Sequence, residues 1–412
     1  MLKNVKCARC VKCGKEYEAT PNLTNCECGG ILDIIYDYDY IKANLTKEKL
    51  KSRPNTMWRY RELLPVEETT PDTPLRVGWS PLYEEDRLAK LLGLKKLWVK
   101  DDGQNPTASL KDRASAMAVA KAKEAGAEII ACSSTGNAAS SLAGNAAAAG
   151  LKTFIFVPSR APKGKVAQLM TFGANVISVQ GNYEETFELS KKAIDKWGWY
   201  NRNAAINPYL SEGKKTVALE IMEQLSWQVP DYIAISVGDG CTIAGLWKGL
   251  KDLYAIGFID RLPRLISAQA EGCCPINRAI AENKPWEPME ENTLADSIAV
   301  GVPRNPDKAL RAIRESDGVA VNVSDGEILE AMRLLGRTQG VFGEPAGVTG
   351  TAGVKKALEL GLISPDSTVV SIVTGNGLKD VQNGIKAAGE PMLVKPDMDA
   401  LLSAFDKAGI CP

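Results

Sequence analysis

The sequence contains no histidine, and this absence excludes several kinds of catalytic machinery. A chain without imidazole has no serine–histidine or cysteine–histidine catalytic group, no histidine-ligated catalytic zinc of the common kinds and no c-type haem site. Any proton transfer must therefore use lysine, a carboxylate, tyrosine, cysteine, water or a cofactor.

The chain also lacks an excess of either charge and has no long apolar run. Its 50 lysines and arginines balance 50 aspartates and glutamates over 412 residues. Zero net charge argues against a nucleic-acid or anionic-membrane partner, although it is compatible with a local basic patch. No run approaches the roughly 18 apolar residues of a membrane span, and the charged N-terminus has no apolar signal region. We expect a cytoplasmic protein that binds a small molecule, with no nucleic acid and no membrane as partner.

Half of the ten cysteines lie in the first 28 residues, a distribution unlike that of a secreted disulfide framework. Two tight pairs, each followed by glycine, can place four thiolates tetrahedrally around Zn²⁺. The predicted ligands are Cys10, Cys13, Cys26 and Cys28. Cys7 can replace one of them, because it has the same spacing to Cys10 as Cys10 has to Cys13. Residues 1–40 are therefore predicted to form a zinc-ribbon-like module with a structural role; the alternative is a module of the same shape without metal.

Strand-like and helix-like segments alternate from about residue 95 to residue 385. The predicted strands are 95–101, 128–134, 152–158, 175–180, 231–238, 263–270, 318–324 and 367–375. The predicted helices are 111–126, 137–150, 164–173, 183–197, 243–257, 326–340 and 346–361. This alternation is typical of parallel sheets that are covered by helices on both faces, and two such blocks predict two α/β domains.

The two domains are predicted to interrupt one another along the chain. Residues 41–107 and 206–412 would form the larger domain, and residues 108–205 the smaller one. A tail is expected from about Gly389 onward, consisting of an extended run and one docking helix.

Ligands of open α/β sheets bind beyond the carboxyl ends of the strands, so the strand-to-helix junctions are the places to look for chemistry. The first junction carries Lys111 at the start of a helix. The positive end of the helix dipole disfavours protonation of an amine there, which suits a nucleophile or a base. The ordinary alternative is a solvated lysine in the first turn of a helix.

Three further junctions have ligand-binding character. Ser133 to Ala138 offers hydroxyls and N–H donors at a helix start, either as a cradle for a carboxylate or as a simple N-cap. Gly238 to Thr242 has two glycines that let the backbone approach an anion, and it predicts a phosphate cup or a plain glycine turn. It has neither the Walker A nor the dinucleotide-binding spacing. Thr374 to Asp380 places a hydroxyl at the end of a strand.

An amine, a carboxylate cradle, a phosphate cup and a hydroxyl, in this order along two α/β domains, are the parts that hold pyridoxal phosphate. The chain resembles the threonine synthases among the fold-type II pyridoxal-phosphate enzymes. The resemblance rests on the cysteine pairs and on the motifs at 57–61, 78–82, 105–113, 134–137, 207–213, 344–346 and 374–380. The motifs are individually loose but specific together. They imply two doubly wound domains of the tryptophan synthase β type, and a homodimer is usual for similar enzymes.

The resemblance also implies roles for particular residues. Lys111 would be linked covalently to the cofactor, Asn137 would bind its 3′ oxygen, and Thr374 would face its pyridine nitrogen. The cofactor phosphate would be held by Gly238, Asp239, Gly240, Cys241 and Thr242. The substrate carboxylate would be clamped by Ser134, Thr135 and Gly136.

The reaction implied is a γ-elimination and β-addition that converts O-phospho-L-homoserine and water into L-threonine and phosphate, a lyase step of threonine biosynthesis. A second anion site is then needed for the phosphate of the substrate. Lys165 is the first choice for this site, and Arg160, Ser109 and Lys379 are weaker ones. The alternative for Lys165 is a solvated helix start.

Departures from the family pattern leave the substrate open. The segment around the lysine reads Ala108-Ser109-Leu110-Lys111-Asp112-Arg113-Ala114 where the family commonly has Gly-Ser-Phe-Lys-Asp-Arg-Gly. The phosphate cup is often Gly-Asn-x-Gly-Asn, and a histidine often stands where this chain has Asn376. A cysteate synthase-like enzyme acting on O-phosphoserine and sulfite is therefore an alternative, and a threonine or serine dehydratase is disfavoured by the cysteine module. A non-catalytic metabolite-binding protein is the remaining alternative, although it would have no need of Lys111.

Overall fold

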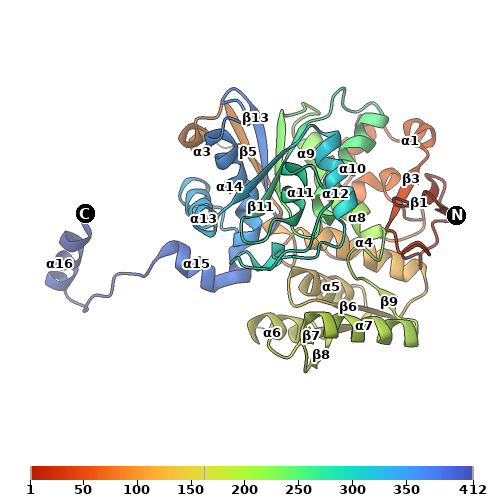
Figure 1. The fold of residues 1–412 in the computed structure, drawn as a ribbon, viewed down its shortest axis with the longest axis horizontal. Coiled ribbons are helices and arrows are strands. Elements are labelled where there is room, and N and C mark those ends of the chain that lie inside the picture. The colour runs from red at the N-terminus through yellow and green to blue at the C-terminus, as the bar shows by residue number, and fades with distance from the viewer. Residues whose placement is uncertain (1, 85, 162, 411–412) are drawn as a thin grey trace.

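The structure, a computed structural model, describes residues 2–84, 86–161 and 163–410. It contains a three-stranded, a six-stranded and a four-stranded sheet (Figure 1). Within the described residues, no helix is long and apolar enough to cross a membrane.

The cysteine-rich N-terminus forms the small three-stranded sheet. Strand β1 (Val5–Cys10) pairs antiparallel with β2 (Glu16–Tyr17) and β3 (Leu32–Tyr36). The chain continues through three short helical segments: α1 (Tyr38–Asn44), α2 (Lys47–Lys51) and the 3-10 segment η1 (Met57–Leu63). Asp37 and Thr46 cap α1 and α2 by accepting hydrogen bonds from backbone N–H groups of the first turn. Ile34 and Tyr36 of β3 pack into the core of the large sheet, so the module is joined to the body of the protein.

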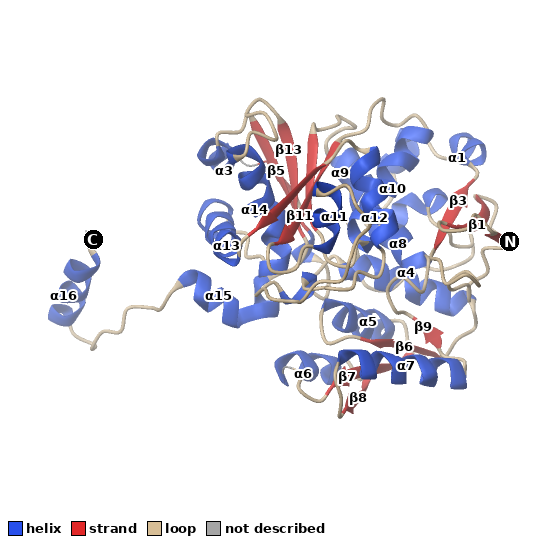
Figure 2. Cartoon of the chain, viewed as in Figure 1, coloured by secondary structure: helices blue, strands red, loops and turns tan. Residues whose placement is uncertain are grey.

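The six-stranded sheet has the order β12-β11-β10-β13-β5-β4, and β4 alone runs antiparallel to its neighbour. Its strands are β4 (Leu82–Glu84), β5 (Lys96–Asp101), β10 (Tyr232–Ser236), β11 (Arg264–Ala270), β12 (Val319–Val323) and β13 (Thr368–Val373). Figure 2 shows helices on both sides of this sheet. Every residue of β10 is buried, which is expected of a parallel strand covered on both faces.

The helices associated with this sheet come from most of the chain. They are α3 (Asp86–Leu92), α8 (Tyr209–Lys214), α9 (Thr216–Gln224), α10 (Cys241–Ala255), α11 (Pro275–Ala281), α12 (Pro306–Glu315), α13 (Asp325–Gln339) and α14 (Pro345–Glu359). Helix α13 begins at a capping box in which Ser324 and Glu327 exchange hydrogen bonds, and it ends at Gly340 with φ +68°. Three short 3-10 segments, η2 (Asp102–Gln104), η3 (Asp296–Ile298) and η4 (Gly377–Asp380), lie in the connections.

The four-stranded sheet is wholly parallel and has the order β8-β7-β6-β9. Its strands are β6 (Ile129–Ser133), β7 (Lys152–Pro158), β8 (Asn175–Val179) and β9 (Tyr200–Asn201), with helices α5 (Asn137–Ala148), α6 (Lys163–Thr171) and α7 (Tyr183–Trp197). Each strand and helix predicted from residue 95 onward is present, and the α/β class is confirmed.

Helix α4 (Lys111–Glu124) belongs to both large cores. Ala116 and Met117 pack in the core of the six-stranded sheet, and Ala118 and Val119 pack in the core of the four-stranded one. Small alanine side chains on both faces allow this close packing. Lys111, the first residue of α4, therefore lies where the two sheet systems meet.

The C-terminal segment extends away from the body (Figure 1). Helix α15 (Val381–Ala388) is followed by an extended run and by α16 (Met398–Ala408), as predicted. Helix α16 has no buried residue, so the expectation that it docks on its own chain is wrong. Its N-cap, Asp397, stabilises the helix locally by accepting a hydrogen bond from the N–H of Ala400.

Candidate active site

A cavity of about 760 Å³ lies at the carboxyl ends of strands from both α/β sheets. Among its lining residues are Lys111, Ser133, Ser134, Thr135, Gly136, Asn137, Arg160, Gly238, Asp239, Thr242 and Thr374. All four junctions singled out in the sequence therefore open into one cavity. This is the position at which doubly wound folds bind their ligands.

Lys111 is held in the cavity by the end of β13. The N–H of Leu110 donates a hydrogen bond of 2.8 Å to the carbonyl of Thr374, and Ser109 forms an isolated β-bridge with Gly375. Burial lowers the pKa of Lys111 to about 8, and the positive charges of Lys214 and Arg202 act in the same direction. A much larger share of its amine is free near neutral pH than in an ordinary lysine, as a nucleophile or base requires.

The turn before Lys111 is strained and firmly anchored. Ala108 has φ +67°, a left-handed conformation that costs a non-glycine residue about 1 kcal/mol, at the position where the family motif commonly has glycine. The carboxylate of Asp112 accepts hydrogen bonds from the N–H and the hydroxyl of Thr107 and from the amide of Asn145. These bonds hold the strained turn closed.

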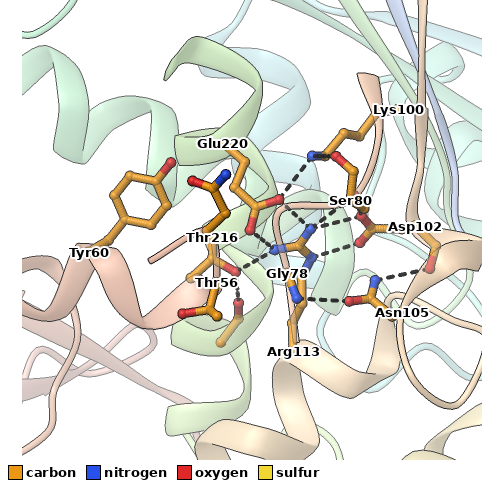
Figure 3. Close-up of polar contacts among 12 residues, drawn as sticks. Thr56, Tyr60, Gly78, Ser80, Lys100, Asp102, Asn105, Arg113, Thr216 and Glu220 are labelled. Atoms are coloured by element: carbon orange, nitrogen blue, oxygen red, sulfur yellow. Dashed lines mark hydrogen bonds and ion pairs between the residues drawn. The ribbon is translucent and has the colours of Figure 1, made fainter. Parts of the chain in front are cut away.

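A buried ion network surrounds Arg113, two residues after Lys111 in the sequence (Figure 3). The guanidinium of Arg113 binds both carboxylate oxygens of Asp102 and both of Glu220, and Lys100 donates to Glu220 as well. Arg113, Asp102 and Glu220 have fully buried side chains. The network ties α4, η2 and α9 together two residues after the lysine.

Asn137 and Glu344 meet on the wall of the cavity. The side-chain amide of Asn137 donates a hydrogen bond of 2.6 Å to Oε1 of Glu344. Burial raises the pKa of Glu344 to about 7, even though Asn137 and the cations Lys165, Lys111 and Lys379 lower it. Glu344 is thus a carboxyl group that changes charge near neutral pH beside the amide predicted to bind the cofactor oxygen.

The predicted carboxylate cradle lies at the start of α5. Gly136 is the N-cap residue, and its N–H donates to the hydroxyl of Ser134 at 3.2 Å. The hydroxyl of Ser133 is buried without a hydrogen-bond partner among the described residues. The positive helix end and these hydroxyls are suited to an anionic group.

The predicted phosphate cup lies between β10 and α10. Gly240 has φ +85°, and a Cβ atom there would lie 2.4 Å from the carbonyl oxygen of Asn305. The N–H of Cys241 donates to Oδ1 of Asp239 at 2.8 Å, so the aspartate uses one donor of the cup. Gly238, Asp239 and Thr242 line the cavity, whereas Gly240 and Cys241 stand behind them. Burial raises the pKa of the Cys241 thiol to about 11, so this thiol is not a nucleophile near neutral pH.

The candidates for a second anion site are only partly brought together. Arg160 lines the cavity. Lys165 forms an ion pair of 2.6 Å with Asp296, itself a lining residue. Lys379 instead donates to the hydroxyl of Ser140 and to Gln168. Ser109 is buried, and its hydroxyl has no partner among the described residues.

Several lining residues were given no role from the sequence, among them Cys132, Arg202, Asn203 and Glu344. Cys132 lies at the end of β6, directly before Ser133. Arg202 and Asn203 follow β9, a two-residue strand with no sequence signal. Glu344, the N-cap residue of α14, belongs to the motif at 344–346, which supported the resemblance without giving this residue a role.

Four cysteine thiols converge in the N-terminal module. The sulfur atoms of Cys10, Cys13, Cys26 and Cys28 all lie within 4.8 Å of one another, and three of the pairs are 3.5 to 3.6 Å apart. Tetrahedral zinc with Zn–S bonds of about 2.3 Å places its sulfurs about 3.8 Å apart. A Cβ atom at Gly30 would lie 2.5 Å from the sulfur of Cys10, which explains the glycine after the second pair. The cluster fits a four-thiolate metal site.

Comparison with known proteins decides the family. The model of the pyridoxal-phosphate dependent enzymes matches residues 74–375, a segment that includes Lys111 and Thr374. The chain belongs to this family. The fold agrees, because a solved threonine deaminase of Solanum lycopersicum superposes with a TM-score of 0.64 at 20% identity, covering 75% of this chain and 87% of that one. Maize serine racemase superposes with a TM-score of 0.62 at 21% identity over 80% and 93% of the two chains.

Curated relatives are similar along nearly the whole chain. Threonine synthase of Methanocaldococcus jannaschii is 44% identical over 398 residues, which cover 95% of this chain and 98% of the relative. Threonine synthase of Methanosarcina acetivorans is 43% identical over 405 residues, covering 97% and 99%. The similarity therefore extends well beyond the segment that the family model matches.

The cavity of this pyridoxal-phosphate dependent enzyme fits its cofactor. Lys111 supplies an amine with a lowered pKa, and the glycines of the cup leave room for a phosphate beside the start of α10. The buried hydroxyl of Ser133 and the amide nitrogen of Asn203 have no partner among the described residues. Unpaired buried donors of this kind are expected where a polar ligand supplies the missing acceptors.

Proposed function

We propose that the chain is a threonine synthase, converting O-phospho-L-homoserine and water into L-threonine and phosphate in threonine biosynthesis. The observation that carries the proposal is the 43–44% identity to threonine synthases over at least 95% of the chain. The cavity supports it, because one amine, one carboxylate cradle and two groups of anion-binding residues surround the same space.

Each junction is assigned one task in this reaction. Pyridoxal phosphate, when bound, supplies the electron-withdrawing group that makes carbon atoms near the substrate amine acidic. Lys111 would hold the cofactor through its side-chain amine, and the same amine, when free, would take the proton from Cα of the substrate and move a proton at Cβ. Its lowered pKa supports this role, because a base must be partly deprotonated at the working pH.

The other residues bind and orient. We assign the substrate carboxylate to Ser134, Thr135 and Gly136, and the cofactor phosphate to Gly238, Asp239, Gly240, Cys241 and Thr242. Asn137 binds the cofactor 3′ oxygen, and the hydroxyl of Thr374 faces the ring nitrogen. For the substrate phosphate, Arg160 is favoured by its place on the cavity wall, and Lys165 through its ion pair with the lining residue Asp296. Ser109 and Lys379 remain weaker assignments, because both stand behind the lining.

Two assays test the proposal. The purified protein should absorb visible light through its bound cofactor, and Lys111→Ala should abolish that band. The loaded protein should then release phosphate and form threonine from O-phosphohomoserine. No threonine from this substrate, with phosphate released from O-phosphoserine in the presence of sulfite, would identify a cysteate synthase-like enzyme instead. A colourless protein would support the non-catalytic metabolite-binding alternative.

We further propose that the four cysteines hold a structural Zn²⁺. The spacing of their sulfurs and the N–H of Lys12, which donates to the sulfur of Cys10 at 3.4 Å, support this assignment. All four thiolates would be used as ligands, so the site has no open position for catalysis.

We also propose a cytoplasmic homodimer without a nucleic-acid or membrane partner. The described cysteines are all free thiols, which is typical of a reducing compartment. Exposed apolar side chains on the C-terminal segment, such as Ile385 and Met398, support contact with a second copy. Light scattering of the purified protein measures the mass, which should be twice that of one chain.

A further inference from the structure

Arg202 is a buried cation without an anionic partner among the described residues. Its side chain lies on the wall of the cavity, and the residue is only 2% exposed. Nε and Nη2 both donate to the hydroxyl of Ser115, at 3.3 and 3.2 Å. Among the described residues, Ser115 is the acceptor found for this guanidinium, and no described carboxylate forms an ion pair with it. Burying a charge in this way is costly unless a counter-ion completes the site.

Asn203 provides a second unpaired donor at the same place. Its Oδ1 accepts a hydrogen bond of 2.9 Å from the N–H of Ser133, which determines the orientation of the side-chain amide. The Nδ2 group is then the free end, and it is buried without a partner among the described residues. Asn203 is 3% exposed and lines the cavity beside Arg202. The Arg202 guanidinium and the Asn203 amide can therefore donate to the same acceptor in the cavity.

The charges around the predicted phosphate cup explain why a cation is needed. Asp239 lies in the cup. Although burial by itself raises its pKa, the charges of Lys214 and Lys111 lower it below the ordinary value, so this carboxyl group is ionised. A phosphate dianion would be repelled by Asp239 and would find the N–H of Cys241 already taken. Arg202 interacts electrostatically with Asp239, so its charge acts on the cup.

We propose that Arg202 and Asn203 bind a phosphate group in this cavity, with the guanidinium as its counter-charge and the Asn203 amide as a neutral donor. The planar guanidinium presents parallel N–H groups that match phosphate oxygens. Both the cofactor and the substrate of the proposed reaction carry phosphate, and the choice of these two ligands rests on the proposed function.

The test compares Arg202→Gln with Arg261→Gln, which removes the same charge from an exposed arginine paired with Asp231. On cofactor-free protein, the affinities for pyridoxal phosphate and for pyridoxal are measured by the absorbance of the bound ligand. On loaded protein, binding of inorganic phosphate and of L-threonine and the KM for O-phosphohomoserine are measured. R202Q should lose at least about tenfold in affinity for a phosphate-bearing ligand and less than about twofold for pyridoxal and L-threonine.

The arms identify the source of the phosphate. A loss confined to pyridoxal phosphate assigns Arg202 to the cofactor, and a loss confined to inorganic phosphate and O-phosphohomoserine assigns it to the substrate. Equal losses for ligands with and without phosphate would overturn the proposal, as would unchanged binding of every phosphate-bearing ligand. The cofactor and inorganic phosphate arms need no turnover, so failure to make threonine would reject the proposed function without affecting this result.

Two more variants keep the proposal testable if R202Q does not fold. Asn203→Asp keeps the acceptor for the N–H of Ser133 but replaces the free donor by an anionic oxygen, and it should weaken the same ligands as R202Q. Arg202→Lys keeps the charge and should recover part of the affinity. A well-folded N203D that binds every phosphate-bearing ligand as tightly as the unchanged protein would contradict the proposal.

Discussion

Arg113 and Glu220 form a bidentate ion pair in the interior, with Nη1 2.5 Å from Oε1 and Nη2 2.7 Å from Oε2. Both side chains have no solvent exposure, Asp102 binds the other side of the guanidinium, and Lys100 balances the charge of the second carboxylate. Arg113 lies two residues after Lys111, so this pair fixes the first turn of α4 against α9. The pair therefore contributes to the position of Lys111 as well as to stability.

Replacing Arg113 by methionine should destabilise the protein by about 3–5 kcal/mol, because two buried carboxylates lose their shared counter-charge. Denaturant unfolding of cofactor-free protein measures the change. Arg264→Met is the matched control: Arg264 pairs with Asp317 on the surface and should change stability by less than about 1 kcal/mol. An R113M protein as stable as the control would show that the network is not stabilising.

Cofactor attachment should depend on pH through Lys111. Because burial lowers the pKa of this amine to about 8, the free-amine fraction should rise about tenfold per pH unit below pH 8 and level off above it. Stopped-flow absorbance after mixing cofactor-free protein with pyridoxal phosphate at pH 6 to 10 follows this rate. A rate that still climbs steeply between pH 9 and 10 would mean that Lys111 is an ordinary surface-like lysine.

Glu344 should make stability fall as pH rises. Its pKa is raised from 4.5 to about 7 in the folded state, so between these values the folded chain binds more protons than the unfolded chain. The unfolding free energy should therefore decrease by on the order of 3 kcal/mol across this window. Glu344→Gln should lack this part of the dependence. Denaturation of both cofactor-free proteins at pH 5 and pH 8 gives the comparison, and parallel curves would contradict the assignment.

Zinc should be found at one equivalent per chain when the protein is purified without chelator. Cys13→Ser removes a ligand from the cluster and should abolish binding, whereas Cys7→Ser should retain the metal because Cys7 lies outside the cluster. Metal analysis of the three proteins decides between the ligand sets. Less than about half an equivalent in the unchanged protein, or equal loss from both variants, would count against the four chosen cysteines.

Much of the architecture was predictable because parallel strands have continuous apolar sequences and their helices have regular periodicity. The predicted helix at 183–197 coincides with α7, which has a capping box at Asn182 and a left-handed glycine at its end. Short elements such as β9 carry no such pattern, because two residues held by pairing with β6 need no intrinsic preference. The domain boundaries stay a prediction.

The site was predictable where glycines, hydroxyls or a lysine mark a strand-to-helix junction, and for this reason Lys111, Asn137 and Thr374 were identified. Arg202 and Asn203 were missed, and Glu344 was part of a motif but received no role, because the importance of these residues comes from burial and from missing or unusual partners. Burial and hydrogen-bond partners depend on tertiary packing, which cannot be predicted from a local sequence pattern. The partners of Lys379, Ser140 and Gln168, could not be predicted for the same reason, since they come from distant segments.

The alanines of α4 impose a constraint on divergence and on engineering. Because one face of this helix belongs to each core, any enlargement of a side chain on α4 must be accommodated by the core that receives it, without moving the helix. A chimaera that takes its four-stranded sheet from a relative must therefore keep α4 of this chain unchanged. If it takes α4 from the relative, it must also take the residues that pack against both faces of this helix. The amine of Lys111 is thus carried by a segment that cannot be exchanged with either half alone.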